Sequence, residues 1–572
     1  MSVQNEHPTS DIDVVTANPS VLSRRGFLSG VGSMAAVFAA GGLGLEAVVN
    51  PESLASANEV GPLIGFPRLN QAYNLRVDDA NRISAKGIPA HPCNNDEALY
   101  ASKIGNYTKG LPHNPATYEV DPGAYNALIT ALTTGHPADF AAIPQGGSRK
   151  FVNPQSGLAY DTEGCDPHQF AIPPAPAFAS AEEAAEAAEL YWMALLRDVN
   201  FNDYGTHPNA AAAATELNVL TDFKGPRIGG SVTAQSLFRD NLPGALTGPY
   251  LSQFMLKPTP FGAEYIVRKI RTFNPNTDRV VTLPNWYQVQ IGNVPESLSF
   301  DGVRRFIRNG RDLSAWVQRD VLFQAYFNAC LILATPPDPS DPVTGGGIGA
   351  PLNPGNPYRT SANQEGFGTF GAPAIKTLLC EVSTRALKAV WFQKWFVHRR
   401  LRPEAYGGRV HLQKAGIRAY PVHAQILNSQ AVSRTFTKFG TYLLPQAFPE
   451  GSPTHPAYGA GHATVAGACV TILKALFDGS FVIPTPVVTD ATGSNLVPYG
   501  GGPLTVTGEL NKLASNIATG RNHAGVHWRS DATESLKLGE QIAIEVLRSM
   551  KPTFNEGGSF NFQKFDGTNV VI

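Results

Sequence analysis

The stretch SPTHPAYGAGHAT, residues 452–464, places two histidines seven residues apart in a turn rich in proline and glycine. An uninterrupted apolar run, Val465 to Leu476, follows it. That run has the length of a helix and contains no proline, so we expect His462 to lie at or just before a helix N-terminus. Free backbone amides and the positive end of the helix dipole favour an anion at such a position. Taken alone, the stretch fits equally well a tight turn that carries a solvated histidine.

Two further stretches carry charged residues of complementary type. KWFVHRRLRP spans residues 394–403, and RNHAGVHWRSD spans residues 521–531. The second contains His527, which Asp531 follows four residues later. Arginine makes planar, bidentate contacts with oxygen, whereas lysine supplies a point charge. On its own, the upstream stretch is most simply a solvated helix end. Together, the three stretches predict an oxyanion pocket with an acid–base group or a ligand built in.

The order of these residues resembles that of a known superfamily. The vanadium-dependent haloperoxidases and the type 2 phosphatidic-acid phosphatases share a pattern in this order: lysine, Arg-Pro, Gly-His, and then arginine with a histidine six residues later. The eight-residue step from Lys394 to Arg402 and the runs SPTHPAYGAGHA and GVHWRSD look most like the algal and cyanobacterial bromoperoxidase branch. Weaker similarity in NYTKGLPHN (106–114) and YWMALLRDV (191–199) extends the resemblance over most of the chain after its first sixty residues.

The resemblance implies a vanadate cofactor and assigns residues to it. Lys394, Arg402 and Arg521 would hold the equatorial oxygens, and the amide of Gly461 would add a neutral donor. His527 would be the axial ligand, bound to vanadium through a ring nitrogen.

It also implies roles for residues around the cofactor. Asp531 would accept the other ring N–H of the axial histidine, because both lie on one helix face if Trp528 opens the last helix. His462 matches the acid–base histidine that helps to deprotonate hydrogen peroxide. His455 corresponds to an additional pocket histidine, and Trp391 to a variable position that lines the halide approach. Trp391 is equally well explained as part of a helix core.

One position departs from the family pattern. Where much of the family has Ser-Gly-His, this chain has Ala460-Gly461-His462. The absent hydroxyl would cost about 1 kcal/mol of neutral hydrogen bonding, which is small beside three cations and an axial ligand. We therefore expect vanadate binding to survive, while the halide preference stays open. His398 and His523 have no counterpart role, and we interpret them as structural.

The resemblance predicts a vanadate-dependent peroxidase that oxidises a halide, bromide in the first place, with hydrogen peroxide. The product would be a hypohalous acid equivalent that halogenates a small organic acceptor. One alternative is an acid phosphatase that uses His527 as nucleophile and His462 as acid, because phosphate and vanadate are nearly isosteric. A second is a non-enzymatic, exported oxyanion-binding protein. The long matching flanks and the position of His455 favour the peroxidase.

The rest of the sequence predicts a mainly α protein, a large helical body with few short strands. We expect it to be one compact unit, with residues 58–370 as its N-terminal part and residues 371–572 carrying the vanadate site. The predicted helices are 68–84, 181–195 behind a capping box at Ser180, 314–333, 373–400, a stripe from 510 that ends at Gly520, and 529–550. The predicted strands are 265–273, 279–284 and a hairpin within 554–572, and the loops 336–357 and 477–503 are too rich in glycine and proline for regular structure.

The N-terminus predicts export. Arg24-Arg25 precede an apolar run over 31–49 and an Ala-Ser-Ala cleavage site at 55–57. We interpret residues 1–57 as a Tat-type signal that directs the protein to the periplasm or outside the cell. The alternative is a membrane anchor, but the glycine-rich run would span a bilayer poorly, so we expect no stable membrane insertion after cleavage. The formal charge of −1 argues against a nucleic-acid partner.

The cysteines and the resemblance lead to the remaining predictions. None of the five cysteines forms a CxxC motif, which argues against structural zinc. Cys93 and Cys165 lie in polar loops and could pair after export, whereas Cys330, Cys380 and Cys469 lie in apolar runs. Relatives form dimers and larger shells, so we expect a homo-oligomer. Some relatives bind a structural calcium ion, for which the loop near residues 364–365 is the candidate.

Overall fold

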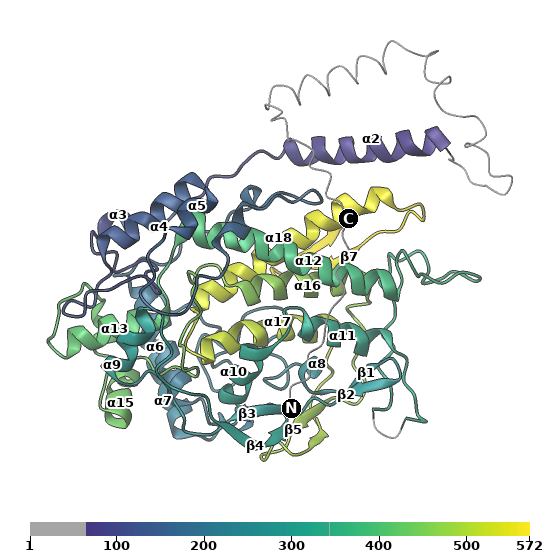
Figure 1. Cartoon of the computed structure of the whole chain (residues 1–572). Coiled ribbons are helices and arrows are strands. Elements are labelled where there is room, and N and C mark those ends of the chain that lie inside the picture. Colours follow the sequence, from purple (N-terminus) through teal and green to yellow (C-terminus); the bar gives the residue numbers. More distant parts are fainter. Residues whose placement is uncertain (1–64, 342–343) are drawn as a thin grey trace, which may run out of the picture. The chain divides into compact units, whose positions relative to one another are not determined.

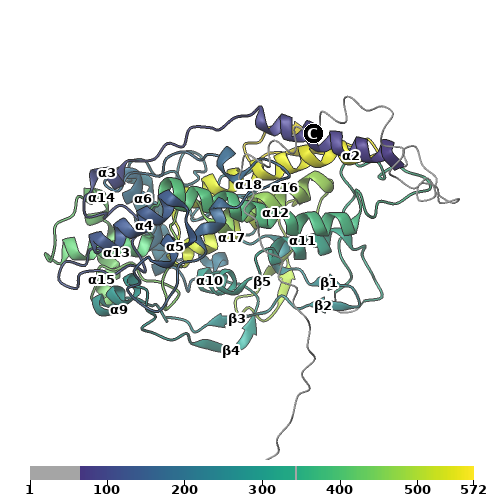
Figure 2. The same ribbon diagram turned by 45° about the horizontal axis from the view of Figure 1, so that its top comes forward.

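The apolar run after His462 forms helix α16, Gly461–Leu476, and every residue of this helix except His462 is buried. It packs against α12 (Ala372–Phe392), α17 (Val506–His523) and α18 (Arg529–Met550), which lie beside it in Figures 1 and 2. Small and apolar residues on all sides of a helix are typical of a helix at the centre of a bundle. The predicted helix start at His462 is therefore confirmed, and it lies at one end of the central helix.

Two glycines allow α16 and α18 to approach each other closely. A methyl group at Gly467 would overlap the carbonyl oxygen of Leu536. A methyl group at Gly539 would likewise overlap the carbonyl oxygen of Thr464. Because no side chain separates the backbones at these points, the start of α18 is held against the start of α16, and the residues at both helix starts can share one site.

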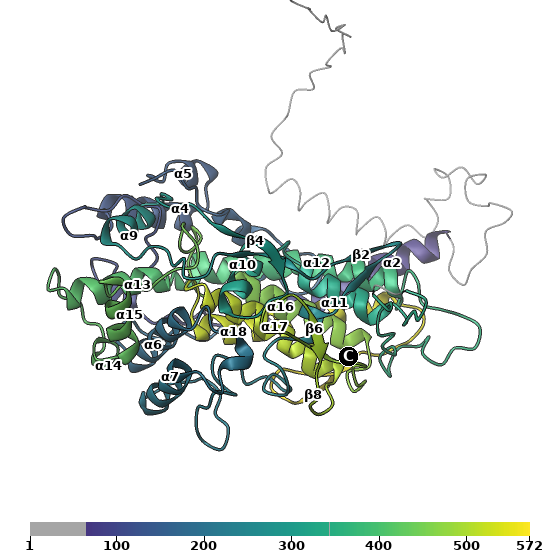
Figure 3. The same ribbon diagram turned by 90° about the horizontal axis from the view of Figure 1, so that it is seen from below.

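The structure is a computed structural model, and it describes residues 65–341 and 344–572. Within them, helices dominate, which confirms the mainly α prediction. The other α-helices are α2 (Gly65–Ser84), α3 (Asp96–Leu99), α4 (Pro122–Thr134), α5 (Pro137–Ala141), α6 (Ala181–Leu195), α7 (Pro208–Val219), α8 (Gln253–Leu256), α9 (Leu283–Gln290), α10 (Gly310–Arg319), α11 (Gln324–Ala334), α13 (Pro403–Lys414), α14 (Ala424–Leu427) and α15 (Gln430–Phe439). Figure 3 shows α10 and α11 next to α16 and α17 from a third direction.

The strands of the described residues form four antiparallel two-stranded sheets. Their members are β1 (Thr259–Phe261) with β2 (Glu264–Ile266), β3 (Ile270–Phe273) with β4 (Phe300–Arg305), β5 (Val487–Thr489) with β6 (Leu496–Pro498), and β7 (Asn561–Gln563) with β8 (Asn569–Val571). The last pair confirms the predicted C-terminal hairpin.

Several predicted elements differ in the structure. The run 314–333 is two helices, α10 and α11, because the backbone of Asp320 is extended and ends the first of them. Helix α17 continues past Gly520 to His523, because this glycine packs against Val317 and Leu313 and does not end the helix. The capping box at α6 is half formed: Ser180 caps the amide of Glu183, but the Glu183 side chain turns to Arg400.

The strand predictions were less accurate. The segment 265–273 divides between β2 and β3, and 279–284 is no strand, because Arg279 makes a single bridge to Gln446 and α9 starts at Leu283. The hairpin of β5 and β6 lies within 477–503, where we expected no regular structure. Short hairpins of this kind depend on turn geometry more than on apolar periodicity.

The predicted helix 373–400 changes character before its end. Its α-helical part, α12, stops at Phe392, and residues Gln393–His398 form a π-helix. Arg399 follows in the left-handed conformation with φ of 42°, and Arg402 is the N-cap of α13. π-Helical turns occur frequently at functional sites, and this one carries Lys394.

Residues 79–572 form one compact unit, and the described residues 65–78 belong to a separate one. The division of the larger unit at residue 370 stays a prediction. The predicted signal, residues 1–57, lies outside the described residues. Among the described helices, none combines the length and the apolar character that a membrane span requires.

All five cysteines are free, so the pairing that we considered possible for Cys93 and Cys165 is not found in the structure. Cys93 is exposed, and its thiol lies 3.5 Å from Oδ1 of Asn95. Cys165 is buried, and its thiol lies 3.8 Å from Oε2 of Glu545. The two thiols thus have different partners on different parts of the fold.

Candidate active site

Three buried cations come together from three separate elements. Nζ of Lys394, on the π-helix, donates to the carbonyl oxygens of Pro456 and Ala457 at 2.8 and 3.0 Å. Nε of Arg402 donates to the carbonyl oxygen of His455 at 2.8 Å. Arg521, on α17, donates from Nη1 to the carbonyl oxygen of Val317 at 2.8 Å, and its Nε is buried without an acceptor. Lys394 and Arg402 thus bind the same loop, at residues 455–457, and Arg521 lies near enough for its charge to lower the pKa of both.

These cations have no carboxylate partner among the described residues, unlike the equally buried Arg197 and Arg400. Burial lowers the pKa of Lys394 well below its ordinary value, and the charge of Arg402 adds to the effect. Burial also lowers the pKa of Arg402 to about 10. Buried charges normally require a partner, so this cluster of like charges is suited to an anion that the protein chain itself does not supply.

His527 is held between a carboxylate and one of the cations. Its Nδ1 lies 2.8 Å from Oδ2 of Asp531, and Nη1 of Arg402 lies 3.0 Å from its Nε2. A guanidinium can only donate, so Nε2 carries the lone pair and Nδ1 carries the proton. Burial and the nearby cations lower the pKa of His527 well below its ordinary value. The neutral ring therefore offers a nitrogen ligand on the side of the cations.

The predicted hydrogen bond between His527 and Asp531 has a local origin. Trp528 is the N-cap of α18, and Asp531 is the third residue of that helix. The backbone amide of Trp528 donates to Oδ2 of Asp531 at 3.1 Å, which orients the carboxylate at the helix start. The i, i+4 spacing then brings the imidazole of His527 to the same oxygen.

His455 and Trp391 form one wall of the site. Nη2 of Arg402 lies 2.8 Å from Nδ1 of His455, and the rings of His455 and Trp391 are 4.9 Å apart. Nζ of Lys394 lies 5.6 Å from the centroid of the Trp391 ring. The indole donates to the carbonyl oxygen of Val152 at 3.0 Å. Trp391 is thus both a core residue of α12 and a neighbour of two predicted site residues.

Gly461 and His462 open α16. A methyl group at Gly461 would come within 2.9 Å of the Trp391 ring, so this position requires glycine. The N-cap, Ala460, makes no side-chain hydrogen bond to the first turn, and its own amide donates to Oγ of Ser535 at 2.7 Å. The first amides of α16 are therefore free to bind an anion.

His462 differs from the other site histidines because it combines an acidic partner with access to solvent. Its Nε2 lies 3.0 Å from Oδ1 of Asp320, and its side chain is 26% exposed. Asp320 follows α10 in the chain and was not predicted, because nothing in the sequence links it to a histidine 142 residues away. This pair can hold or transfer a proton at the edge of the cationic cluster.

The sequence also missed Arg400. No role was predicted for Arg400, which the stretch taken alone would place at a solvated helix end, but it is 2% exposed and binds Asp531, Glu183 and Glu186. Arg399, in contrast, pairs with Glu97. The only sequence signal was the row of glutamates in 181–195, which we had attributed to helix formation.

The two histidines that we interpreted as structural lie apart from the cations' contacts. His523 is fully buried, with Nε2 at 3.1 Å from the hydroxyl of Tyr250 and rings of Phe201 and Phe238 around it. His398 is buried with its ring edge against Tyr458.

The pH dependence of stability should reveal the burial of His523. Burial lowers its pKa to about 3, so between this value and about 6.5 the unfolded chain binds a proton that the folded protein excludes. The buried His523 therefore lowers the free energy of unfolding as the pH falls through this window, by up to about 1.4 kcal/mol per pH unit. We expect His523→Phe to make the free energy of unfolding correspondingly less dependent on pH between 4 and 6, measured by urea titration. An unchanged slope would contradict the burial of a neutral ring.

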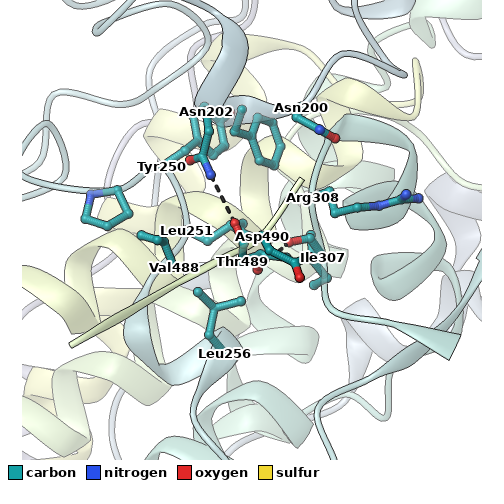
Figure 4. Close-up of a pocket in the computed structure, with 12 residues that line it drawn as sticks. Asn200, Asn202, Tyr250, Leu251, Leu256, Ile307, Arg308, Val488, Thr489 and Asp490 are labelled. Atoms are coloured by element: carbon teal, nitrogen blue, oxygen red, sulfur yellow. Dashed lines mark hydrogen bonds between the residues drawn. The ribbon is translucent and has the colours of Figure 1, made fainter. Parts of the chain in front are cut away.

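One pocket of the described residues lies apart from the predicted site residues. Figure 4 shows a pocket lined by Asn202, Tyr250, Arg308 and Asp490 among others; its volume of about 20 Å³ has room for little more than a water molecule. No group of three or more His, Cys, Asp or Glu side chains in the described residues is arranged for a metal cation. The predicted calcium loop contains Glu365, which is exposed, and calcium binding there stays a prediction.

The site residues fit vanadate. A tetrahedral oxoanion would supply the charge that Lys394, Arg402 and Arg521 lack, and an acceptor for the orphaned Nε of Arg521. The lone pair on Nε2 of His527 is the type of ligand that a metal centre requires. The donor set that the sequence predicted is thus assembled in one place.

Comparisons with known proteins agree with a vanadate site. Residues 380–556 match the family model described as the VCPO second helical-bundle domain. The vanadium-dependent bromoperoxidase of Corallina officinalis is 36% identical, over 88% of this chain and 98% of the relative. That of Ascophyllum nodosum is 34% identical, over 88% and 92%.

A solved structure shows the same fold. The homohexameric second vanadate-dependent bromoperoxidase of Ascophyllum nodosum superposes with a TM-score of 0.84 at 31% identity, over 92% of this chain and 95% of that chain. Similarity of this extent, together with the cation cluster and its histidine, shows that the chain belongs to the family of the vanadium-dependent bromoperoxidases.

Proposed function

We propose that this protein is a vanadate-dependent haloperoxidase that oxidises bromide with hydrogen peroxide to a hypobromous acid equivalent, which then brominates a small organic acceptor. The observation that carries the proposal is the cluster of three buried cations without carboxylate partners beside the lone pair of His527. Bound vanadate would supply a Lewis acid that polarises the peroxide, and the oxidation state of the vanadium would stay the same.

The residues of the chain divide the remaining work. Lys394, Arg402 and Arg521 bind the oxoanion and neutralise its charge. His462 handles the proton of the peroxide: with its Nε2 proton donated to Asp320, its Nδ1 is left to accept one. Of the histidines at the site, only this one combines partial exposure with an acidic partner, so a proton can leave through it to solvent.

The proposal is tested by bromination of monochlorodimedone with hydrogen peroxide and bromide, before and after vanadate loading. We expect turnover that requires vanadate and is suppressed by excess phosphate, which competes for the same cations. His462→Ala should retain vanadate binding and lose roughly 10²- to 10⁴-fold in turnover. Hydrolysis of phosphate esters without bromination would assign the site to a phosphatase, and anion binding with neither activity would leave an oxyanion-binding protein.

We further propose that bromide is preferred over chloride, since the similar proteins bear the name bromoperoxidase. Ala460 is the residue to examine, because it is buried at the start of α16 and lacks the hydroxyl of the serine that much of the family has at this position. The Ala460→Ser variant tests whether that hydroxyl changes the ratio of bromide to chloride turnover.

Assembly and location complete the proposal. A homo-oligomer is supported by the homohexameric relative. We propose that residues 1–57 direct export to the periplasm or outside the cell, as their twin arginines and apolar run suggest.

A further inference from the structure

Behind His527, on the side away from the cations, lies a buried cluster around Arg400. Nη1 of Arg400 donates to Oδ1 of Asp531 at 2.9 Å and to Oγ of Ser530 at 2.8 Å. Its Nη2 donates to Glu183 and, at 3.1 Å, to Oε2 of Glu186. One guanidinium thus binds three carboxylates that come from two helices, α6 and α18.

The two oxygens of the Asp531 carboxylate have different partners. Oδ1 accepts from Arg400, while Oδ2 accepts from Nδ1 of His527 at 2.8 Å and from the backbone amide of Trp528 at 3.1 Å. The bond to Arg400 thus fixes the side of the carboxylate that Trp528 and His527 do not hold, and keeps Oδ2 turned towards the imidazole.

The consequence reaches the anion pocket through the imidazole ring. With Oδ2 of Asp531 held as acceptor, the proton of His527 lies on Nδ1 and the lone pair on Nε2, to which Nη1 of Arg402 donates at 3.0 Å. If the carboxylate turned away, Nδ1 would lose its acceptor and the ring proton would be free to move to Nε2. The nitrogen facing the cations would then be unable to bind a metal centre.

The position of Arg400 is itself determined by its surroundings. Glu183 and Glu186 lie one turn apart on α6 and hold one side of the guanidinium. The ring of Trp528, 4.6 Å from the guanidinium carbon to the ring centroid, packs against its face. Arginine is needed here, because the planar fork binds carboxylates in two directions while stacking on an aromatic ring, and lysine cannot do both.

We propose that Arg400 is a positioning residue for the vanadate site: it holds the carboxylate of Asp531 in the orientation that accepts from Nδ1 of His527, and thereby fixes the tautomer of His527 that can bind the cofactor. Glu183 and Glu186 hold Arg400 in place. The inference rests on the proposed role of His527 as vanadium ligand, but not on peroxidase turnover, because its readouts are the ring tautomer and the binding of vanadate.

The chain contains a matched control in Arg529. This arginine is also buried, and it also joins α18 to α6, by a pair of hydrogen bonds to Glu189. It makes no hydrogen bond to Asp531 among the described residues. Replacing Arg400 or Arg529 by methionine therefore removes a buried arginine that ties α18 to α6, but only the first change removes a hydrogen bond to Asp531.

The first experiment measures the dissociation constant for inorganic vanadate by equilibrium dialysis, alongside the melting temperature. We expect Arg400→Met to weaken vanadate binding by roughly 10- to 100-fold, the usual range for losing a group that orients a metal ligand. Arg529→Met should also lower the melting temperature but leave the dissociation constant unchanged. Equal weakening by both variants, or none by Arg400→Met, would overturn the proposal.

The second experiment tests whether Arg400 acts through Asp531. Solid-state ¹⁵N spectra of histidine-labelled protein without vanadate, with the His527 signals assigned by difference from His527→Gln, report the ring tautomer. We expect Arg400→Met to shift the proton from Nδ1 and Arg400→Lys to restore it in part. If Arg400→Met does not fold, the double variant with Asp531→Asn removes both charges. Vanadate affinity in that double variant should equal that of Asp531→Asn alone, and a further loss would contradict action through Asp531.

The proposed function and this inference can fail separately. If the protein binds vanadate and hydrolyses phosphate esters without brominating, the peroxidase proposal fails. The effect of Arg400 on vanadate affinity and on the tautomer would then still be expected, since His527 must present the same nitrogen in a phosphatase.

Discussion

Replacing His527 by alanine is expected to lower the affinity for vanadate by more than about 100-fold, because changes in groups that merely orient a ligand already cost 10- to 100-fold. The lone pair on its Nε2 is the nitrogen ligand that faces Lys394, Arg402 and Arg521. Without it, the three cations would hold the oxoanion by charge alone and exchange it readily. Bromination should fall to background at vanadate concentrations that saturate the unaltered enzyme.

Equilibrium dialysis against vanadate, with activity assayed on the dialysed protein, measures both effects. His523→Phe is the control, because this buried histidine lies four residues earlier and bonds to Tyr250, not to the cations. It should retain both vanadate and activity. If His527→Ala held vanadate as tightly as the control, the nitrogen ligand would have to come from elsewhere in the site.

Replacing Arg521 by methionine is expected to abolish stabilisation by anions while leaving the anion-free protein as stable as before, or more stable. Arg521 is buried with one carbonyl partner and an orphaned Nε, and burial lowers its pKa below the ordinary value. Its removal relieves repulsion among the three cations. The unaltered protein should gain about 2.7 kcal/mol at a vanadate concentration 100 times the dissociation constant, and the variant should gain little at that same concentration.

The same substitution at Arg197 should have the opposite effect on the anion-free protein. Arg197 is equally buried but pairs with Asp278, whose carboxylate is also fully buried. Arg197→Met leaves that pair broken, and we expect a loss of about 3–5 kcal/mol. Unfolding in urea with and without vanadate compares the two variants. A large loss at Arg521 in the absence of anion would mean that its charge is balanced within the protein.

Local features of the site could be read from the sequence because they depend on short spacings. The i, i+4 relation of His527 and Asp531 and the helix start at His462 follow from helical periodicity and from the residues that begin helices. For the same reason, the bounds of the last helix, Arg529–Met550, were predicted correctly. The family pattern supplied Lys394 and Arg521, which the structure places near enough for the charge of Arg521 to lower the pKa of Lys394.

Which distant residues meet was decided only by tertiary structure. Asp320 reaches His462 because the run 314–333 breaks into α10 and α11, and no periodicity in that run predicts the break. Arg400 is buried because α6 and α18 enclose it with carboxylates, although its sequence neighbours suggest a solvated helix end. The physical reason is that apolar periodicity records which face of an element is buried, whereas the pairing of buried charges depends on where the packed helices place them.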